Sequence, residues 1–257
     1  MAAVRPTILP VVPRFLNRIY QSCVVTANRT SLFRHVFNLG LQLKTGELYR
    51  GLVRKDSIID KLLFWFVRQK VGGNVRLMIC GSAPLRNVVM SFMRATMGCV
   101  IVEGYGLTEC VGPVTLNVPG DMTECVGPPL PCNNIKLVDI PDMEYYSSRG
   151  QGEICVMGAN VFQGYFRSDI SPPPPHTSLL TPSISRDPER TASVMDSEGW
   201  FHTGDVGEFL PNGTLRIIDQ KKLVFKLSRG EYVAPDKVEQ IYKASSYIDQ
   251  VARNLPV

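Results

Sequence analysis

The residues with the clearest chemical potential form the hexapeptide GYGLTE, which runs from Gly104 to Glu109. Glycines on both sides of an aromatic residue let the backbone turn tightly and approach a flat ligand closely. In such a site Tyr105 stacks on a nucleotide base, the Thr108 hydroxyl bonds a phosphate oxygen, and Glu109 ligates Mg²⁺. The alternative interpretation is a simple glycine turn beside a tyrosine of the core.

This hexapeptide differs from the dinucleotide-binding pattern G-x-G-x-x-G by one acidic residue. Glu109 stands where that pattern has its third glycine. A negative charge at this position repels a pyrophosphate unless a metal ion lies between them. The hexapeptide therefore favours a metal–nucleotide complex over NAD.

A second candidate is the segment WFHTGDVG, residues 200 to 207. A carboxylate held by a Thr-Gly turn at the start of a strand can accept two hydrogen bonds from a vicinal diol, such as the ribose hydroxyls. Asp205 is the carboxylate in question; in the alternative interpretation it accepts hydrogen bonds from loop amides. For His202 we favour a surface or packing role over catalysis.

A third candidate is the cationic stretch from Arg216 to Tyr232. Its charges suit either a nucleic-acid surface or a solvated face. Aromatic residues are not interleaved with the charges, as they are in proteins that bind single strands. The stretch alone therefore favours a solvated face.

The elements that position these residues follow from hydrophobic spacing. Residues 75–80 form an apolar run that ends at Gly81, which predicts a buried strand. A helix is expected to begin near Pro84, with Ser82 as a candidate cap, and to end at Gly98. Residues 99–102 predict a second strand, parallel to the first. Ligands bind beyond the carboxyl ends of such strands, where the loops at residues 81–84 and 103–109 are expected to lie.

The composition changes after Pro113 to short β-type runs separated by proline and glycine. We expect an α/β fold: a parallel sheet with flanking helices, a small β-rich subdomain, and the start of a truncated α+β C-terminal domain. The predicted boundaries are 1–126, 127–218 and 219–257, with an Asn-Gly hairpin turn at 211–214. Residues 219–222 form a polar joint, before a strand at 223–227 and a helix from Pro235. A proline- and serine-rich insertion occupies about 168–186.

Charge and cysteine content limit the function classes. The formal net charge is +5, and the seven cysteines are scattered without a C-x-x-C pair, which favours reduced thiols and shows no metal-binding pattern. No apolar run approaches the roughly 20 residues that span a bilayer, and no signal peptide is visible. The arginine-rich start is compatible with a transit peptide, but three prolines between Pro6 and Pro13 disfavour the amphipathic helix that such peptides need.

Taken together, the segments resemble the adenylate-forming superfamily, and specifically its long-chain fatty acyl-CoA synthetases. The resemblance covers most of the chain in order. The segments that carry it are 6–17, 81–85, 103–109, 127–131, 152–166 and 196–238.

The resemblance implies a two-step reaction that uses ATP, Mg²⁺, coenzyme A and a fatty acid. It implies catalytic roles for Thr108, Glu109 and Lys226, with Glu109 holding Mg²⁺. The residues implied to contact the nucleotide are Gly81, Ser82, Ala83, Pro84, Gly104, Tyr105, Gly106, Thr108, Asp205, Asp219 and Gln220. No nucleic-acid partner is implied. The resemblance also implies a location on the cytosolic face of the endoplasmic reticulum or the mitochondrial outer membrane. The family associates with the membrane through a segment that is not visible in this sequence.

The sequence departs from the family pattern at several points. The phosphate-binding loop and the C-terminal adenylation lysine are not among these residues, and Gln220 replaces the hinge arginine. We therefore expect negligible acyl-CoA synthesis by this chain alone, because two transition-state stabilisers are missing. One alternative is a non-catalytic isoform that acts through protein partners, and another is a ligase for a different carboxylic acid.

Overall fold

The computed structural model describes residues 3–121, 123–166 and 186–220, together with 225–226, 232–233 and 242. Its contacts divide the chain into two compact units. The first comprises Met1–Asn133 and Gly213–Leu215, and the second comprises Asn134–Asn212 and Arg216–Val257.

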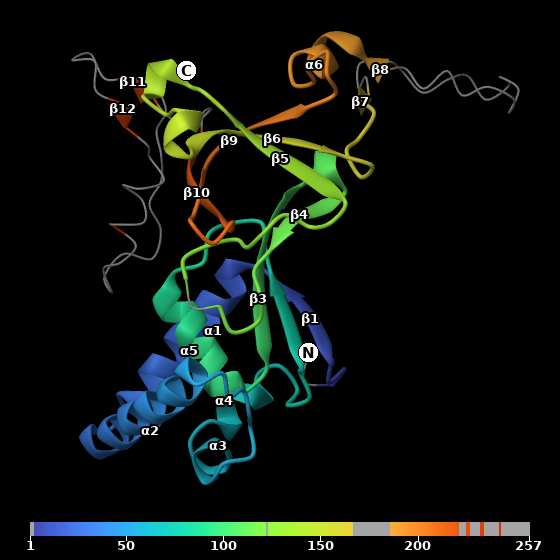
Figure 1. Cartoon of the computed structure of the whole chain (residues 1–257). Helices are drawn as coiled ribbons and strands as arrows, with labels where there is room; N and C mark the ends of the chain where they lie inside the picture. The colour runs from blue at the N-terminus through green and yellow to red at the C-terminus, as the bar shows by residue number, and fades with distance from the viewer. Residues whose placement is uncertain are drawn as a thin grey trace, which may run out of the picture. The chain divides into compact units, whose positions relative to one another are not determined.

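The first unit contains a mixed, mostly parallel sheet in the order β1-β2-β3-β4 (Figure 1). Its strands are β1 (Ile8–Val11), β2 (Leu77–Cys80), β3 (Val100–Leu107) and β4 (Gly112–Leu116). The pairs β1–β2 and β2–β3 are parallel, and β3–β4 is antiparallel. The predicted parallel strand–helix–strand unit is confirmed, and the α/β class with it.

The helices of this unit include three long ones that pack together. They are α1 (Pro13–Ala27), α2 (Ser31–Tyr49) and α5 (Asn87–Met97), with the short helices α3 (Ile58–Leu62) and α4 (Trp65–Gln69) between them in sequence. α5 contacts α1, α2 and α4. Figure 1 shows α1 and α5 beside one face of the sheet. Leu9 and Met78 are buried there, whereas Ile79 points the other way and is 37% exposed.

Helix α5 begins later than the sequence predicted. Its first residue is Asn87, and Arg86 caps it without a side-chain hydrogen bond, so neither Pro84 nor Ser82 has the predicted role. Ser82 instead adopts φ +76°, and the Leu85 amide donates to Glu103 Oε1 at 3.1 Å. This bond holds the chain outside the helix. The helix ends at Gly98 with φ +57°, as predicted.

A buried ionic network joins α2, α3 and α4. Lys44 Nζ lies 2.9 Å from Asp60 Oδ2, and Arg68 Nη1 lies 3.2 Å from Asp60 Oδ1. The Lys44 and Asp60 side chains are only 2% and 0% exposed. Lys44 also donates to the carbonyl of Arg54 at 2.9 Å. Asp60 therefore pairs with two cations, of which Lys44 also pairs with Glu47 at 2.9 Å.

Glu47, at the edge of this network, should make the free energy of unfolding depend on pH in acid. Its hydrogen bonds to Arg54, and then to Lys44, lower its pKa from 4.5 to about 2. A carboxylate whose pKa is lower in the folded state stabilises the fold at pH values above its unfolded-state pKa. This stabilisation is lost as pH falls through the folded-state pKa. We expect Glu47→Gln to flatten the pH dependence of the free energy of unfolding between about pH 4.5 and 2. Urea titrations across this range test it; an unchanged slope would contradict it.

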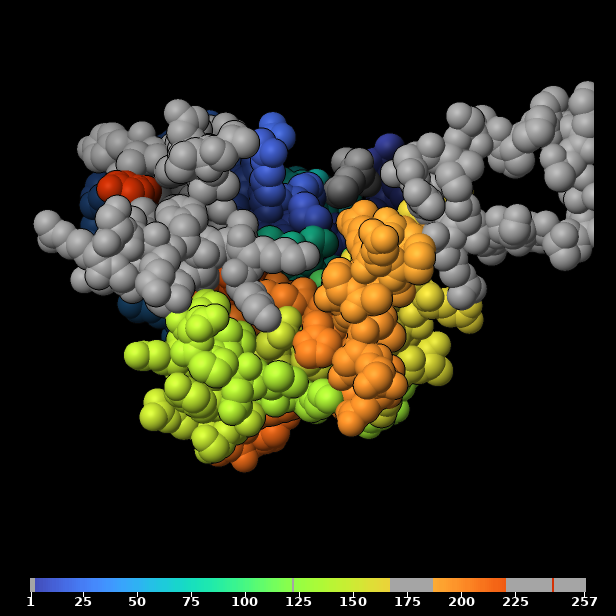
Figure 2. Space-filling model, turned by 90° about the horizontal axis from the view of Figure 1, so that it is seen from above, coloured from blue at the N-terminus to red at the C-terminus, as the bar shows by residue number. Residues whose placement is uncertain are grey.

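The second unit contains most of a sheet in the order β10-β9-β6-β5. The strands are β5 (Asn133–Val138), β6 (Gln151–Gly158), β9 (Phe201–Phe209) and β10 (Leu215–Gln220). β6 and β9 are antiparallel. Figure 2 shows segments 134–166 and 186–220 side by side. The β-type runs predicted at 135–138, 153–157 and 215–218 lie in β5, β6 and β10, and the run at 206–210 lies in β9 except for Leu210.

Shorter elements complete the described residues. β7 (Tyr165–Phe166) pairs with β8 (Arg186–Asp187), next to α6 (Pro188–Ala192), and β11 (Phe225–Lys226) pairs with β12 (Tyr232–Val233). One-turn 3₁₀ helices are η1 (Thr108–Cys110), η2 (Pro141–Met143) and η3 (Ser147–Arg149).

Residues 211–214 connect the neighbouring strands β9 and β10, as predicted, but the predicted turn type is wrong. Only Gly213 has a positive φ, +79°, so the turn is not the two-residue Asn-Gly type. In the polar joint predicted at 219–222, Asp219 and Gln220 complete β10, and residues 221 and 222 lie outside the described residues. Almost all of the proline-rich segment and the helix predicted from Pro235 lie outside the described residues, as does most of the strand predicted at 223–227.

Six of the seven cysteines are buried, and Cys132 is exposed. Burial raises the pKa of Cys23 and Cys110 to about 11, and that of Cys80 and Cys99 to about 12. These four thiols stay protonated at neutral pH, and only the thiolate is strongly nucleophilic.

Candidate functional site

The carboxyl ends of β2 and β3 meet where the sequence placed the first part of the site. A Cβ atom added to Gly81 would lie 3.4 Å from the Gly104 carbonyl oxygen. The Gly81 amide also donates to the carbonyl of Val11, at the end of β1. The two glycine-containing segments therefore lie together at this edge of the sheet. Ser82, Ala83 and Pro84 are exposed beside it.

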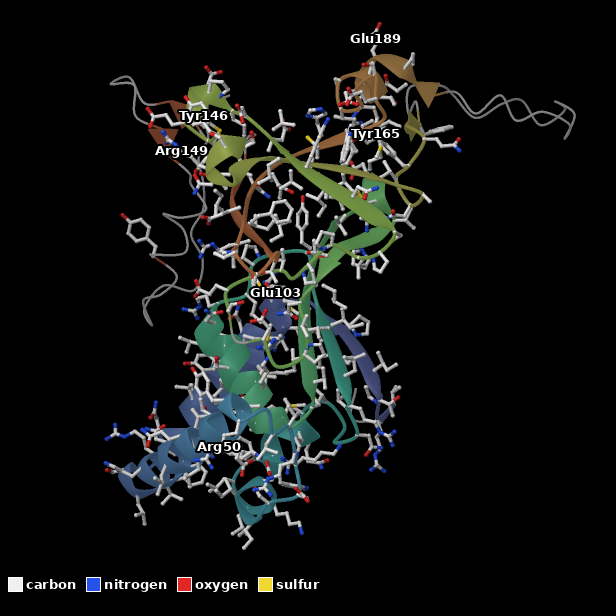
Figure 3. The ribbon with its side chains drawn as sticks, viewed as in Figure 1. Arg50, Glu103, Tyr146, Arg149, Tyr165 and Glu189 are labelled. Atoms are coloured by element: carbon white, nitrogen blue, oxygen red, sulfur yellow. The ribbon has the colours of Figure 1, made fainter. Side chains whose placement is uncertain are left out.

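Glu103 fixes this edge, and sequence reasoning did not single it out (Figure 3). Its Oε1 accepts from the Leu85 amide, and its own amide donates to Asn117 Oδ1 at 2.8 Å. Burial raises the pKa of this carboxyl group. Because these bonds tie the segment after Gly81 to β3, Glu103 positions the residues around it. An acid at the end of an apolar strand was the available signal.

The hexapeptide from Gly104 to Glu109 is mostly a strand, not the predicted loop. β3 continues to Leu107 and pairs with β4, with Tyr105 opposite Thr115 and a register shift before Gly106. A Cβ atom on Gly106 would lie only 2.0 Å from the Gly112 carbonyl oxygen. The glycine is needed for close approach to the partner strand. Tyr105 is partly exposed.

Thr108 and Glu109 follow in the one-turn helix η1, where the chain reverses toward β4. Thr108 is exposed and Glu109 is partly exposed. A partly exposed carboxylate supplies the hard oxygen ligands that Mg²⁺ takes, usually one or two carboxylates together with substrate phosphates and water. The residue types at this turn therefore fit Mg²⁺.

Asp205 lies within β9 and not at a strand start, which corrects the prediction. Between the register pairs Glu153–Val206 and Cys155–His202 the strand β9 carries two more residues than β6, so it bulges at 203–205. Gly204 has φ +75°, and the Asp205 amide donates to Thr203 Oγ1 at 3.1 Å. Bulges redirect side chains near functional sites. Asp205 is 8% exposed.

Asp219 has a partner that the sequence did not suggest. The hydroxyl of Tyr145 donates to Asp219 Oδ2 at 3.3 Å, and burial together with this carboxylate raises the pKa of Tyr145. Gln220 is exposed at the end of β10. Lys226 belongs to β11 and is paired with Tyr232. The nucleotide and catalytic roles of these residues stay predictions, as do those of Tyr105, Glu109 and Asp205.

Within the part of the chain that the structure describes, no helix has both the length and the apolar character needed to cross a membrane.

The α/β unit, together with the segments 104–109 and 200–207, defines an adenylate-forming fold. Comparison with known proteins agrees. The AMP-binding enzyme family matches residues 1–166, and the chain belongs to this family. It is 46% identical over 252 residues to long-chain-fatty-acid–CoA ligase 1 of Cavia porcellus and to that of Homo sapiens, covering 98% of this chain and 33% of each relative. The chain thus spans about one third of these curated relatives.

Solved structures give the same fold. The A domain of carboxylic acid reductase from Segniliparus rugosus, in complex with AMP and a co-purified carboxylic acid, aligns with a TM-score of 0.60 and 28% identity. The alignment covers 94% of this chain and 31% of that one. o-Succinylbenzoate CoA synthetase from Bacillus subtilis aligns with a TM-score of 0.57 at 18% identity, over 96% of this chain and 37% of that one, which bears on the fold alone.

Proposed function

We propose that this chain forms part of an ATP-dependent enzyme that activates long-chain fatty acids to acyl-CoA through an acyl-AMP intermediate. The observation that carries the proposal is the 46% identity to long-chain-fatty-acid–CoA ligases over 98% of the chain. The carboxylic acid reductase domain, whose structure contains AMP and a carboxylic acid, supports carboxylate activation as the shared chemistry.

The reaction overcomes the poor electrophilicity of a carboxylate. A carboxylate oxygen attacks the α-phosphorus of ATP, the bond to the β-phosphate oxygen breaks, and pyrophosphate leaves. The thiol of coenzyme A then attacks the acyl carbon, and AMP leaves with the electrons of the acyl C–O bond. Mg²⁺, when bound, offsets the negative charge on the phosphates.

Each site residue has a proposed part in this scheme. Tyr105 stacks on adenine, at the edge formed by the Gly81–Pro84 segment with Gly104 and Gly106. Thr108 bonds the α-phosphate, and Glu109 holds Mg²⁺. Asp205 accepts hydrogen bonds from the ribose hydroxyls, and Asp219 and Gln220 contact the nucleotide as part of a hinge. Lys226 is proposed to act in the thioester-forming step.

Nucleotide binding by the 257-residue chain tests these assignments. We expect Tyr105→Ala and Asp205→Ala each to raise the Kd for AMP by about tenfold or more, because base stacking contributes about 1–3 kcal/mol and 1.4 kcal/mol is tenfold. Isothermal titration calorimetry with AMP, and with MgATP, measures the change.

Exposed residues of the same types provide matched controls. Tyr49 is 72% exposed at the end of α2, and Asp142 is exposed in η2. Tyr49→Ala and Asp142→Ala should bind AMP as the unaltered chain does. If Tyr105→Ala and Asp205→Ala also leave the Kd unchanged, the site assignment is wrong.

A further inference from the structure

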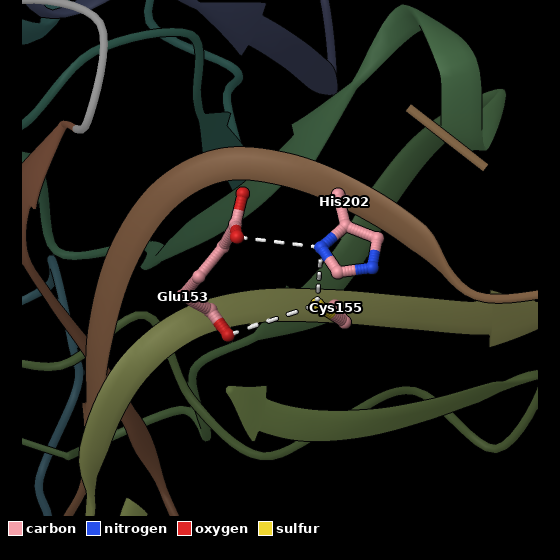
Figure 4. A group of neighbouring side chains, drawn as sticks. All are labelled: Glu153, Cys155 and His202. Carbon is pink, nitrogen blue, oxygen red and sulfur yellow. Dashed lines mark hydrogen bonds and ion pairs between the residues drawn. The ribbon is translucent and has the colours of Figure 1, made fainter. Parts of the chain in front are cut away.

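Three side chains that could ligate a metal ion meet on β6 and β9 (Figure 4). Cys155 Sγ and Glu153 Oε2 each lie 3.3 Å from His202 Nδ1. All three ligand atoms lie within 4.8 Å of one another. Because Cys155 is directly opposite His202 in the strand register, the backbone itself sets this proximity.

The Glu153 carboxylate is held in a fixed orientation. Its Oε1 accepts from the Gly204 amide at 3.2 Å, and its Oε2 is the oxygen that faces His202. The bulge that contains Gly204 makes this bond possible. One oxygen is therefore anchored by the backbone while the other is directed into the cluster.

A further carboxylate lies on the opposite side of the imidazole ring. His202 Nε2 is 3.6 Å from Asp196 Oδ2, and Lys136 Nζ is 3.5 Å from the same oxygen. The Asp196 carboxylate is positioned by the amides of Trp200 and Glu198, which donate to its Oδ1. Carboxylates therefore face both ring nitrogens of His202, Glu153 at Nδ1 and Asp196 at Nε2. Metal-bound histidines usually have such a partner on their second nitrogen.

The three ligand residues are largely shielded from solvent. Cys155 is fully buried, Glu153 is 5% exposed, and the His202 side chain is 29% exposed. A divalent cation bound by all three would neutralise the carboxylate and a thiolate together.

We propose that Glu153, Cys155 and His202 form a zinc site. Sulfur, imidazole nitrogen and carboxylate oxygen are the three ligand types that Zn²⁺ takes, in tetrahedral geometry with water as a fourth ligand. The partly exposed edge of His202 gives that water access. The thiolate selects against Mg²⁺ and Ca²⁺, so the site is distinct from one for nucleotide-bound magnesium.

Metal titration of the chelator-treated chain tests the proposal. We expect about one molar equivalent of Zn²⁺ to be retained through gel filtration in excess Mg²⁺. Co²⁺ in its place should give a thiolate-to-metal charge-transfer band. Cys155→Ser should abolish that band, and Cys155→Ser and His202→Gln should each weaken Zn²⁺ binding by more than about 100-fold, the upper end of the effect of removing an outer-shell partner. Asp196→Asn, which alters such a partner, should weaken binding about 10- to 100-fold.

The chain contains matched controls for the cysteine and histidine variants. Cys132 is an exposed cysteine and His35 is an exposed histidine of α2. Cys132→Ser and His35→Gln should leave zinc stoichiometry and affinity unchanged. X-ray absorption of the unaltered, zinc-loaded chain gives a result that does not depend on any variant folding: one sulfur neighbour is expected. A shell without sulfur, or no retained zinc, overturns the proposal, and the cluster is then a hydrogen-bonded group only.

Discussion

Replacing Asp60 with alanine is expected to lower the free energy of unfolding by about 3–5 kcal/mol. Asp60 is fully buried and pairs with both Lys44 and Arg68. Its removal takes away the carboxylate with which Arg68 pairs, and leaves Lys44 paired with Glu47 at 2.9 Å. It also removes the acceptor of the Ser57 amide at the start of α3. Urea unfolding followed by Trp65 fluorescence, in a Trp200→Phe background, reports on the first unit because the chain has only two tryptophans.

An exposed aspartate nearby provides the control. Asp56→Ala, four residues earlier, should change the free energy of unfolding by less than about 0.5 kcal/mol. Replacing all three network residues together, as Lys44→Met, Asp60→Leu and Arg68→Met, should recover much of the loss, because apolar residues of similar volume need no counter-ion. A small effect of Asp60→Ala would show that water or neighbouring groups solvate the two cations.

Gly106→Ala is expected to destabilise the first unit by about 1–3 kcal/mol or more. The added methyl group would lie 2.0 Å from the Gly112 carbonyl oxygen and 2.6 Å from its carbon. These are backbone atoms, so the strands β3 and β4 must separate to admit it. Because Tyr105 is the adjacent residue of β3, AMP affinity should fall as well. The Trp65 unfolding assay and calorimetry with AMP measure the two effects.

Gly46→Ala is the matched substitution with the opposite expected sign. Gly46 lies inside α2, and a Cβ atom added there meets nothing within 4 Å. Alanine is favoured over glycine inside a helix by about 1 kcal/mol, so this variant should be slightly more stable. If the two alanine variants have the same effect on stability, close strand contact is not what requires glycine at position 106.

The sequence predicted those features of the first unit that depend on residues close together in the chain. The apolar run before Gly81 is β2, and the glycine after α5 ends it in the left-handed conformation. The GYGLTE hexapeptide was interpreted as a loop because its glycines suggested a turn. Its pairing with β4 depends on Gly112 and Pro113, whose approach across the sheet leaves no periodic signal in the sequence.

The sequence suggested residue types for the candidate site but not how they are arranged. Glu103 was within a recognised segment, yet its bond to the Leu85 amide depends on the irregular path after Gly81. His202 was interpreted as a packing or surface residue, and its contacts with Glu153 and Cys155 come from a strand about fifty positions away in sequence. The bulge in β9 sets the register that brings Glu153 and Cys155 to it. Insertions of this kind are invisible to alternation patterns.

The protection of most thiols makes the chain a convenient subject for spectroscopy. Cys132 is the single exposed cysteine, and it lies one residue before Asn133, where the first unit ends along the chain. A maleimide dye or nitroxide would therefore attach at one position without prior removal of the other thiols. A second cysteine introduced in the second unit would then allow distances between the units to be measured before and after nucleotide is added.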